Sequence, residues 1–139
     1  MILMVTVLTF ALAQPAVDAP DADGLTPLMR AAARGDVTSV GDLIGRGAAV
    51  DAQAAGTRVT ALMCAAYFGH VEVVKALLAK SAKPDLKDAT GASAADWAAT
   101  GSRDAAADVL GKAGSQLNPF LNVGVMPFGL MDKAAGKTP

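Results

Sequence analysis

Cysteine, histidine and aromatic side chains are scarce in this chain of 139 residues, with one cysteine, one histidine and 4% aromatics. A single cysteine, Cys64, excludes a disulfide within the chain. Its neighbours Ala65 and Ala66 predict a small buried side chain on a helix. The charges nearly cancel, with 12 Lys and Arg against 13 Asp and Glu. This balance lacks the basic excess of nucleic-acid-binding domains, so we expect no nucleic-acid partner.

Side chains for catalysis are equally few. His70 has no cysteine, histidine or carboxylate at ligand spacing around it, and Glu72, the only glutamate, has no paired carboxylate. The glycines recur at regular intervals and form no phosphate-binding loop. We therefore expect no catalytic residue, metal, cofactor or small-molecule substrate, and predict that the chain is not an enzyme. His70 is expected to hydrogen-bond the backbone at a turn between helices.

What the sequence does contain is an internal repeat. Thr26, Thr60 and Ser93 each open a similar phrase, and they lie 34 and then 33 residues apart. In each phrase a pair of small residues follows, at 31–32, 65–66 and 98–99. A period in this range is typical of a stacked repeat array, which usually offers a binding surface rather than a catalytic pocket.

Each repeat predicts two short helices joined by a turn. Thr26 is suited to cap a first helix, Pro27 to its first position, and Gly35 to its end. A second apolar stripe follows and stops at Gly47. The middle repeat matches this pattern, with Ser81 where glycine stands in the first. Helices near ten residues are unstable alone in water, so stacking has to stabilise them.

The third repeat keeps the frame but loses large apolar side chains. Ala107 and Gly111 stand where the first repeat has Val40 and Ile44. A repeat with so few large apolar side chains is typical of the end of an array. Trp97 is expected to pack at that end, with an exposed recognition role as the alternative.

These residues resemble the ankyrin repeat family over Asp21 to about Ser115. The family phrases appear as Thr26-Pro27-Leu28 in the first repeat and as Gly69-His70 in the second. The histidine that usually follows the first phrase is absent, because Met29, Met63 and Asp96 occupy its positions. The resemblance implies an all-α repeat solenoid, a helix-turn-helix stack with connecting β-hairpin loops. Its repeats span 21–52, 53–85 and 86–115, the last a degenerate cap.

The resemblance also implies a protein-binding module that uses its loops and the concave face of its first helices. The family's surface positions fall on Asp21, Asp23, Leu25, Arg58, Ala89, Thr90, Ala92, Ala33, Arg34, Tyr67, Phe68, Thr100 and Gly101. Among these we select six candidate partner-binding residues: Arg34, Arg58, Tyr67, Phe68, Thr90 and Thr100. An alternative for the two aromatics is that they cover the alanine core of the neighbouring repeat.

The first residues predict export. Residues 1–13 form an uncharged apolar run that ends in a small-x-small pattern, so we expect signal cleavage after Ala13. Residues 14–20 are expected to be a linker. No Lys or Arg precedes the run, so a short membrane anchor, an apolar first helix or an upstream start remain alternatives.

The C-terminal tail, residues 116–139, is apolar without helical spacing. We expect it to fold back in extended form over apolar surface left by the weak third repeat, with a partner-docking peptide or a disordered end as alternatives. For the whole chain we predict a binding module in the periplasm or outside the cell. The alternative is a membrane-anchored accessory that shields or stabilises a co-localised enzyme.

Overall fold

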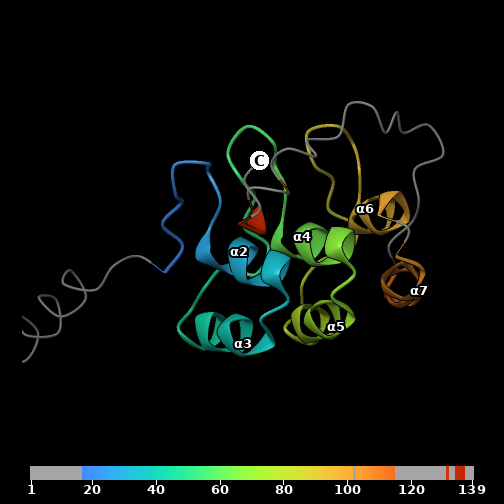
Figure 1. The fold of residues 1–139 in the computed structure, drawn as a ribbon, viewed down its shortest axis with the longest axis horizontal. Helices are drawn as coiled ribbons and strands as arrows, with labels where there is room; N and C mark the ends of the chain where they lie inside the picture. Colours follow the sequence, from blue (N-terminus) through green and yellow to red (C-terminus); the bar gives the residue numbers. More distant parts are fainter. Residues whose placement is uncertain (1–16, 102, 115–130, 132–133, 137–139) are drawn as a thin grey trace, which may run out of the picture.

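Three pairs of short helices stack side by side in the computed structural model, which describes residues 17–101, 103–114, 131 and 134–136. Figure 1 shows one row of first helices above a second row, and no strand occurs in these ranges. The inner row comprises α2 (Pro27–Arg34), α4 (Ala61–Phe68) and α6 (Ala94–Thr100). The outer row comprises α3 (Val37–Gly45), α5 (Val71–Ala79) and α7 (Asp104–Lys112). The predicted all-α solenoid is confirmed.

Hydroxyl side chains begin all three inner helices, as the sequence predicts. Thr26 Oγ1 accepts the N–H of Met29, and Thr60 Oγ1 accepts that of Met63, both at 3.3 Å. Ser93 forms a reciprocal cap, because the Asp96 carboxylate also accepts the Ser93 N–H at 2.8 Å. Each cap satisfies a backbone donor that the first turn of a helix leaves unpaired.

Glycines end the first two inner helices, and they also make room for the next repeat. Gly35 and Gly69 adopt left-handed conformations, with φ of 75° and 73°. A Cβ at Gly35 would lie 2.6 Å from the ring of His70, and one at Gly69 would lie 2.7 Å from the Arg103 side chain. Gly101 differs, with φ of −77°, yet a Cβ there would lie 2.4 Å from the carbonyl oxygen of Tyr67. A Cβ at Gly101 would meet backbone, so this position requires glycine for space, whereas Gly35 and Gly69 require it first of all for their left-handed conformation. The Arg103 side chain over Gly69 is flexible and can shift.

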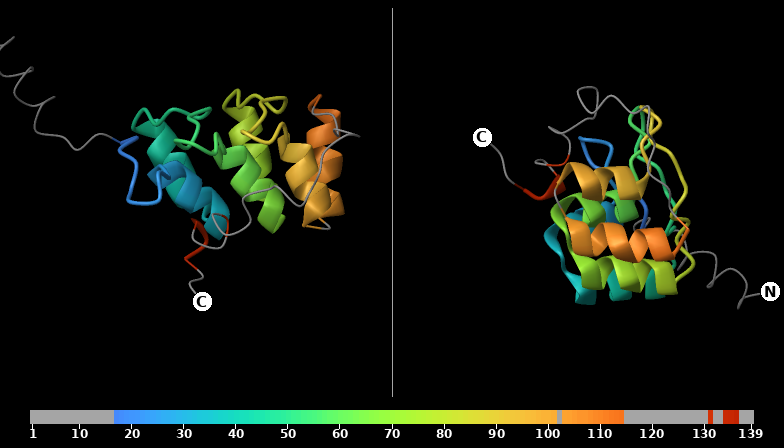
Figure 2. Two further views of the ribbon diagram at one scale, coloured as in Figure 1. Left: turned by 90° about the horizontal axis from the view of Figure 1, so that it is seen from above. Right: turned by 90° about the vertical axis from the view of Figure 1, so that its right-hand side faces the viewer.

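The core is built mainly from small side chains between adjacent inner helices. Ala32, Ala65 and Ala98 are fully buried, one from each repeat. Cys64 and Trp97 are also fully buried, which confirms the packing predicted for both. Figure 2 shows the resulting stack from above and from the end.

The described connections between repeats contain no strand, so the structure does not show the expected β-hairpin loops. A backbone hydrogen bond of 2.8 Å from Ala54 to Val59 closes one, and a bond of 2.9 Å from Asp88 to Ala92 closes the next. The Asp88 carboxylate then accepts the N–H groups of Thr90 and Ala92 from inside its loop, at 2.7 and 3.0 Å. Side-chain acceptors thus replace the strand ladder in this loop.

The described part of the tail differs from the expectation in place and in form. The Ala135 N–H donates to the Met131 carbonyl oxygen at 3.0 Å, which is a helical and not an extended arrangement. A Cβ at Gly136 would lie 3.7 Å from Nη2 of Arg34, so this part reaches the first repeat and not the third. Long-range contacts of this kind leave no periodic signal in a sequence. The rest of the tail, residues 1–13 and residues 14–16 of the predicted linker lie outside the described residues.

Replacing Ser81 by glycine is expected to stabilise the fold. Ser81 has φ of 67°, and its N–H donates to the Leu78 carbonyl oxygen. Gly47, with φ of 94°, has the equivalent place in the first repeat, and its N–H donates to the Ile44 carbonyl oxygen. The left-handed conformation costs a residue with a side chain about 1–2 kcal/mol. Replacement by glycine removes this cost, but glycine loses more conformational entropy on folding, so the net gain is smaller. We expect Ser81→Gly to raise the free energy of unfolding by about 0.5–1 kcal/mol in a urea titration.

The reciprocal change provides the matched control. Gly47→Ser is expected to lower the free energy of unfolding by a similar amount, because it places a side chain in the same conformation. Equal stabilities for Ser81→Gly and the unaltered chain would contradict this account of the helix end.

Candidate protein-binding face

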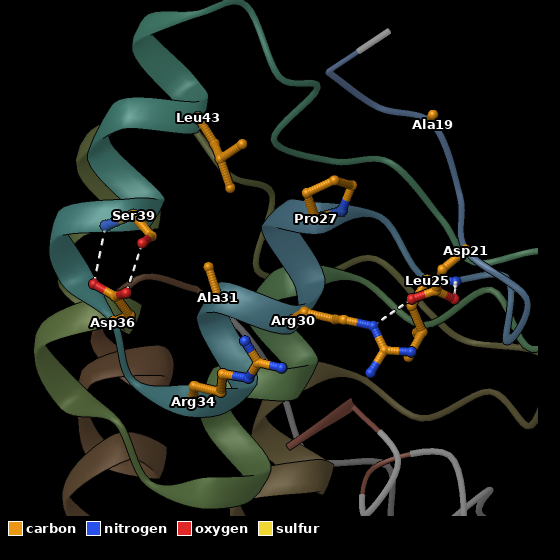
Figure 3. A pocket seen from close by; sticks show the side chains of 10 residues that line it. All are labelled: Ala19, Asp21, Leu25, Pro27, Arg30, Ala31, Arg34, Asp36, Ser39 and Leu43. Carbon is orange, nitrogen blue, oxygen red and sulfur yellow. Dashed lines mark hydrogen bonds and ion pairs between the residues drawn. The ribbon is translucent and has the colours of Figure 1, made fainter. Parts of the chain in front are cut away.

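Arg34 is the exposed cation at the end of α2. Within the described residues its guanidinium makes no hydrogen bond or ion pair, and Figure 3 draws none among the residues that it shows. Beside it lies an open depression of about 440 Å³. The residues that line this depression are Ala19, Asp21, Leu25, Pro27, Arg30, Ala31, Arg34, Asp36, Ser39 and Leu43.

Arg30, one turn before Arg34, forms ion pairs with the loop that precedes α2. Its guanidinium pairs with the Asp21 carboxylate and, at 2.9 Å, with that of Asp23. The hydrogen bond from Arg30 lowers the pKa of Asp21, and the same bond raises the pKa of Arg30. Hydrogen bonds from Ser39 likewise lower the pKa of Asp36 at the edge of the depression. Arg34 is therefore the arginine of this depression whose charge faces outward.

Tyr67 and Phe68 lie at the end of α4 and are half-buried. Their rings meet edge to face at a centroid distance of 5.0 Å. Tyr67 also meets Trp97 edge to face at 5.6 Å, and Phe68 stacks on the His70 ring at 6.1 Å. The pair therefore packs against its own and the following repeat, while part of each side chain stays accessible.

The two threonine candidates use their hydroxyls internally. Thr90 Oγ1 donates to the Asp88 carboxylate at 2.6 Å, and Thr100 Oγ1 donates to the Asp96 carbonyl at 2.8 Å. Arg58, in contrast, is exposed on a loop and has a left-handed backbone with φ of 59°. The threonine hydroxyls thus stabilise their own loop and helix. Arg58 places an exposed positive charge at the tip of a loop.

The six candidates form two groups rather than one patch. Arg34, Thr100 and the aromatic pair lie at the C-terminal ends of the inner helices, as the helix bounds require. Arg58 and Thr90 lie on the loops that precede α4 and α6. The two groups therefore lie at opposite ends of the inner helices, and an eight-residue helix is about 12 Å long. Three further positions carried over from the resemblance are buried and unsuited to contact a partner: Leu25, Ala33 and Ala92.

A buried carboxylate missed by the sequence reasoning holds the third loop. Besides its loop contacts, Asp88 accepts the indole N–H of Trp97 at 3.1 Å, and only 3% of Asp88 is exposed. Asp21 accepts the N–H groups of Asp23 and Leu25 in the same way, at 2.9 and 3.2 Å. Both acids stand at the same distance before their helix cap, Thr26 or Ser93, so this shared spacing could have indicated the role.

His70 performs the structural task expected of it, across a repeat boundary. Its Nε2 lies 3.0 Å from the Ala33 carbonyl oxygen, so this nitrogen carries the proton and donates. In the part of the chain that the structure describes, no group of three or more His, Cys, Asp or Glu residues is placed to hold a metal ion. Cys64 is enclosed, and burial raises its pKa to about 12.

The buried thiol predicts a loss of stability at alkaline pH. The unfolded thiol deprotonates near its ordinary pKa of 9.0, whereas the folded thiol holds its proton until about 12. Folding therefore binds a proton in this window, and the contribution is present below pH 9 and lost as pH rises to 12. The expected slope is about 1.4 kcal/mol per pH unit.

Urea titrations between about pH 8 and 11 on the unaltered chain and on Cys64→Ala measure this slope. The variant is expected to lack this part of the pH dependence, because it lacks the thiol. Parallel stability curves for the two proteins would show that the thiol is accessible in the folded state.

The chain matches the model of a known protein family. A family model described as "Ankyrin repeats (3 copies)" matches residues 28–120. No curated protein matches the chain. Among the described residues, no helix has the length and apolar content needed to span a bilayer.

Proposed function

Because the chain belongs to the ankyrin repeat family, we propose that it is a non-catalytic module that binds another protein through its inner-helix ends and loops. Ankyrin repeats generally bind protein partners. The mechanism is surface complementarity, with no substrate turnover. No small-molecule or nucleic-acid ligand is part of this proposal.

The observation that carries the proposal is the exposed Arg34 on the same ends of the inner helices as Tyr67 and Phe68. Arginine and aromatic side chains supply most of the energy in protein interfaces. Half-burial fixes the two rings, so binding costs them little side-chain entropy. A rigid apolar surface beside an outward-facing charge suits a partner segment that carries an acidic residue next to apolar ones.

The loops supply the second contact region. Arg58 is exposed beside Gly56, whose φ is 79°, at a tip closed by the hydrogen bond between the Ala54 and Val59 backbones. Loops fixed at their base and variable at their tip are common sites of recognition. A partner long enough to reach from Arg34 to Arg58 would bind both groups of candidates at once.

We further propose that the module acts in the periplasm or outside the cell. The uncharged apolar run of residues 1–13 and the pattern before Ala13 support export with cleavage. The alternative, an accessory anchored through residues 1–13 beside a co-localised enzyme, predicts an intact N-terminus on the mature protein. The intact mass of chain recovered from its host separates the two, since cleavage removes residues 1–13.

Charge reversal tests the binding face. We expect Arg34→Glu and Arg58→Glu each to reduce recovery of a specific partner at least about tenfold in a crosslinking pull-down from the host, because each replaces an attractive charge with a repulsive one. Lys80→Glu, at an exposed site after the outer helix α5, is the matched control and should leave recovery unchanged.

Two results would contradict the proposal. A partner recovered equally by all three variants would place binding on another surface. Bait that returns at full length in the membrane fraction without a specific partner would favour the anchored accessory.

A further inference from the structure

Two residues far beyond the last helix pair are fully buried. Met131 and Ala134 each have 0% exposure and belong to the hydrophobic core cluster, although α7 ends at Lys112. Removal of an apolar side chain from water is the main force that holds a segment against a folded domain. The described residues of the segment 131–136 are therefore held against the repeats.

The proximity of Gly136 to Arg34 places this segment at the candidate binding face. A Cβ at Gly136 would lie 3.7 Å from Nη2 of Arg34. In the left view of Figure 2 the red segment lies beside the end of α2 that is remote from the loops. Figure 1 shows it against the inner row, in front of α2. It lies where the first group of partner-binding candidates begins.

The described residues of the segment include one helical turn. The hydrogen bond from the Ala135 N–H to the Met131 carbonyl spans one helical turn. Residues three apart share a helix face, and Met131 and Ala134 are the two that are buried. Ala135, the next residue, is only half-buried. Among the described residues of the turn, Met131 and Ala134 are thus more deeply buried than Ala135.

We propose that Met131 and residues 134–136 are a tethered occupant of the binding face, which a protein partner displaces when it binds near Arg34. The inference rests on the proposed function for the identity of that face. The partner chemistry follows from the occupant: a short helical segment with an apolar side chain and a small residue three positions later. Since the occupant belongs to the same chain, it competes at a concentration that dilution does not lower.

The consequence is that the occupant lowers the apparent affinity of the face for a partner. A partner meets a free site only in the fraction of molecules whose segment has left, so its apparent dissociation constant is raised by the inverse of that fraction. Weakening the segment without touching the inner helices is therefore expected to tighten binding. Loss of an ordinary contact surface would have the opposite effect.

A peptide with the sequence of residues 126–139 is the probe for the face. In the full chain, Ala134→Asp places a charge at the buried position, and Ala135→Asp makes the same change at the half-buried neighbour. By fluorescence anisotropy we expect Ala134→Asp to bind the labelled peptide at least about tenfold more tightly than the unaltered chain. The Ala135→Asp chain should resemble the unaltered one. Equal affinities for all three would overturn the proposal.

Thiol protection measures the occupant directly, without any partner. Native Cys64 is fully buried with a pKa raised to about 12, so it contributes little background reaction. The new thiol of Met131→Cys should react with a disulfide reagent at least about tenfold more slowly than that of Ala135→Cys, and excess peptide should remove the protection. Equal rates, or protection that saturating peptide leaves intact, would overturn the proposal by showing a free tail or a fixed part of the core.

The oligomeric state decides whether the occupant acts within its own chain. Light scattering is expected to give a monomer at concentrations where the thiol of Met131→Cys is protected. A dimer that dissociates together with that protection would mean exchange of the segment between copies, which overturns the tethered form. Because these measurements involve no host partner, failure to recover one would count against the proposed function and not against the occupant.

Discussion

Burial of alanine between neighbouring inner helices is the interaction on which the rest of the structure depends. Helices as short as α2, α4 and α6 do not persist alone in water. With fully buried alanines at the contact, such as Ala32, Ala65 and Ala98, the helix backbones approach closely and each repeat stabilises the next. A chain with 4% aromatic residues can therefore build part of its core by close approach of helix backbones, beside larger buried side chains such as Leu62 and Trp97.

The features predicted from sequence are those that repeat or act locally. Thr26, Thr60 and Ser93 each bond an N–H three residues on, and Gly35 and Gly69 end helices by their own conformation. Such signals need no knowledge of distant contacts. The Asp88–Trp97 hydrogen bond and the return of Gly136 to the first repeat depend on groups that meet only in the folded chain. No periodicity indicates them.

The candidate face was predictable in position but not in detail. Register alone places Arg34 and the aromatic pair at matching ends of α2 and α4. It could not show how much of the Tyr67 side chain packs on Trp97 and how much stays exposed, because both depend on the orientation of the ring in the folded stack. Nor could it show that the Thr100 hydroxyl is already committed to a carbonyl one turn earlier. Whether these residues contact a partner is still a prediction.

The fit of His70 over Gly35, and of Arg103 over Gly69, makes adjacent repeats interlock across their boundary. Each glycine belongs to one repeat, and the side chain that covers it belongs to the next. Asp36, at the same position of the first repeat, instead caps its own helix through the N–H of Ser39. An additional repeat would therefore preserve both junctions only if it supplied a glycine at this position and a side chain that covers the glycine of the repeat before it. A residue with a Cβ at the position of Gly35 would lie against the ring of His70.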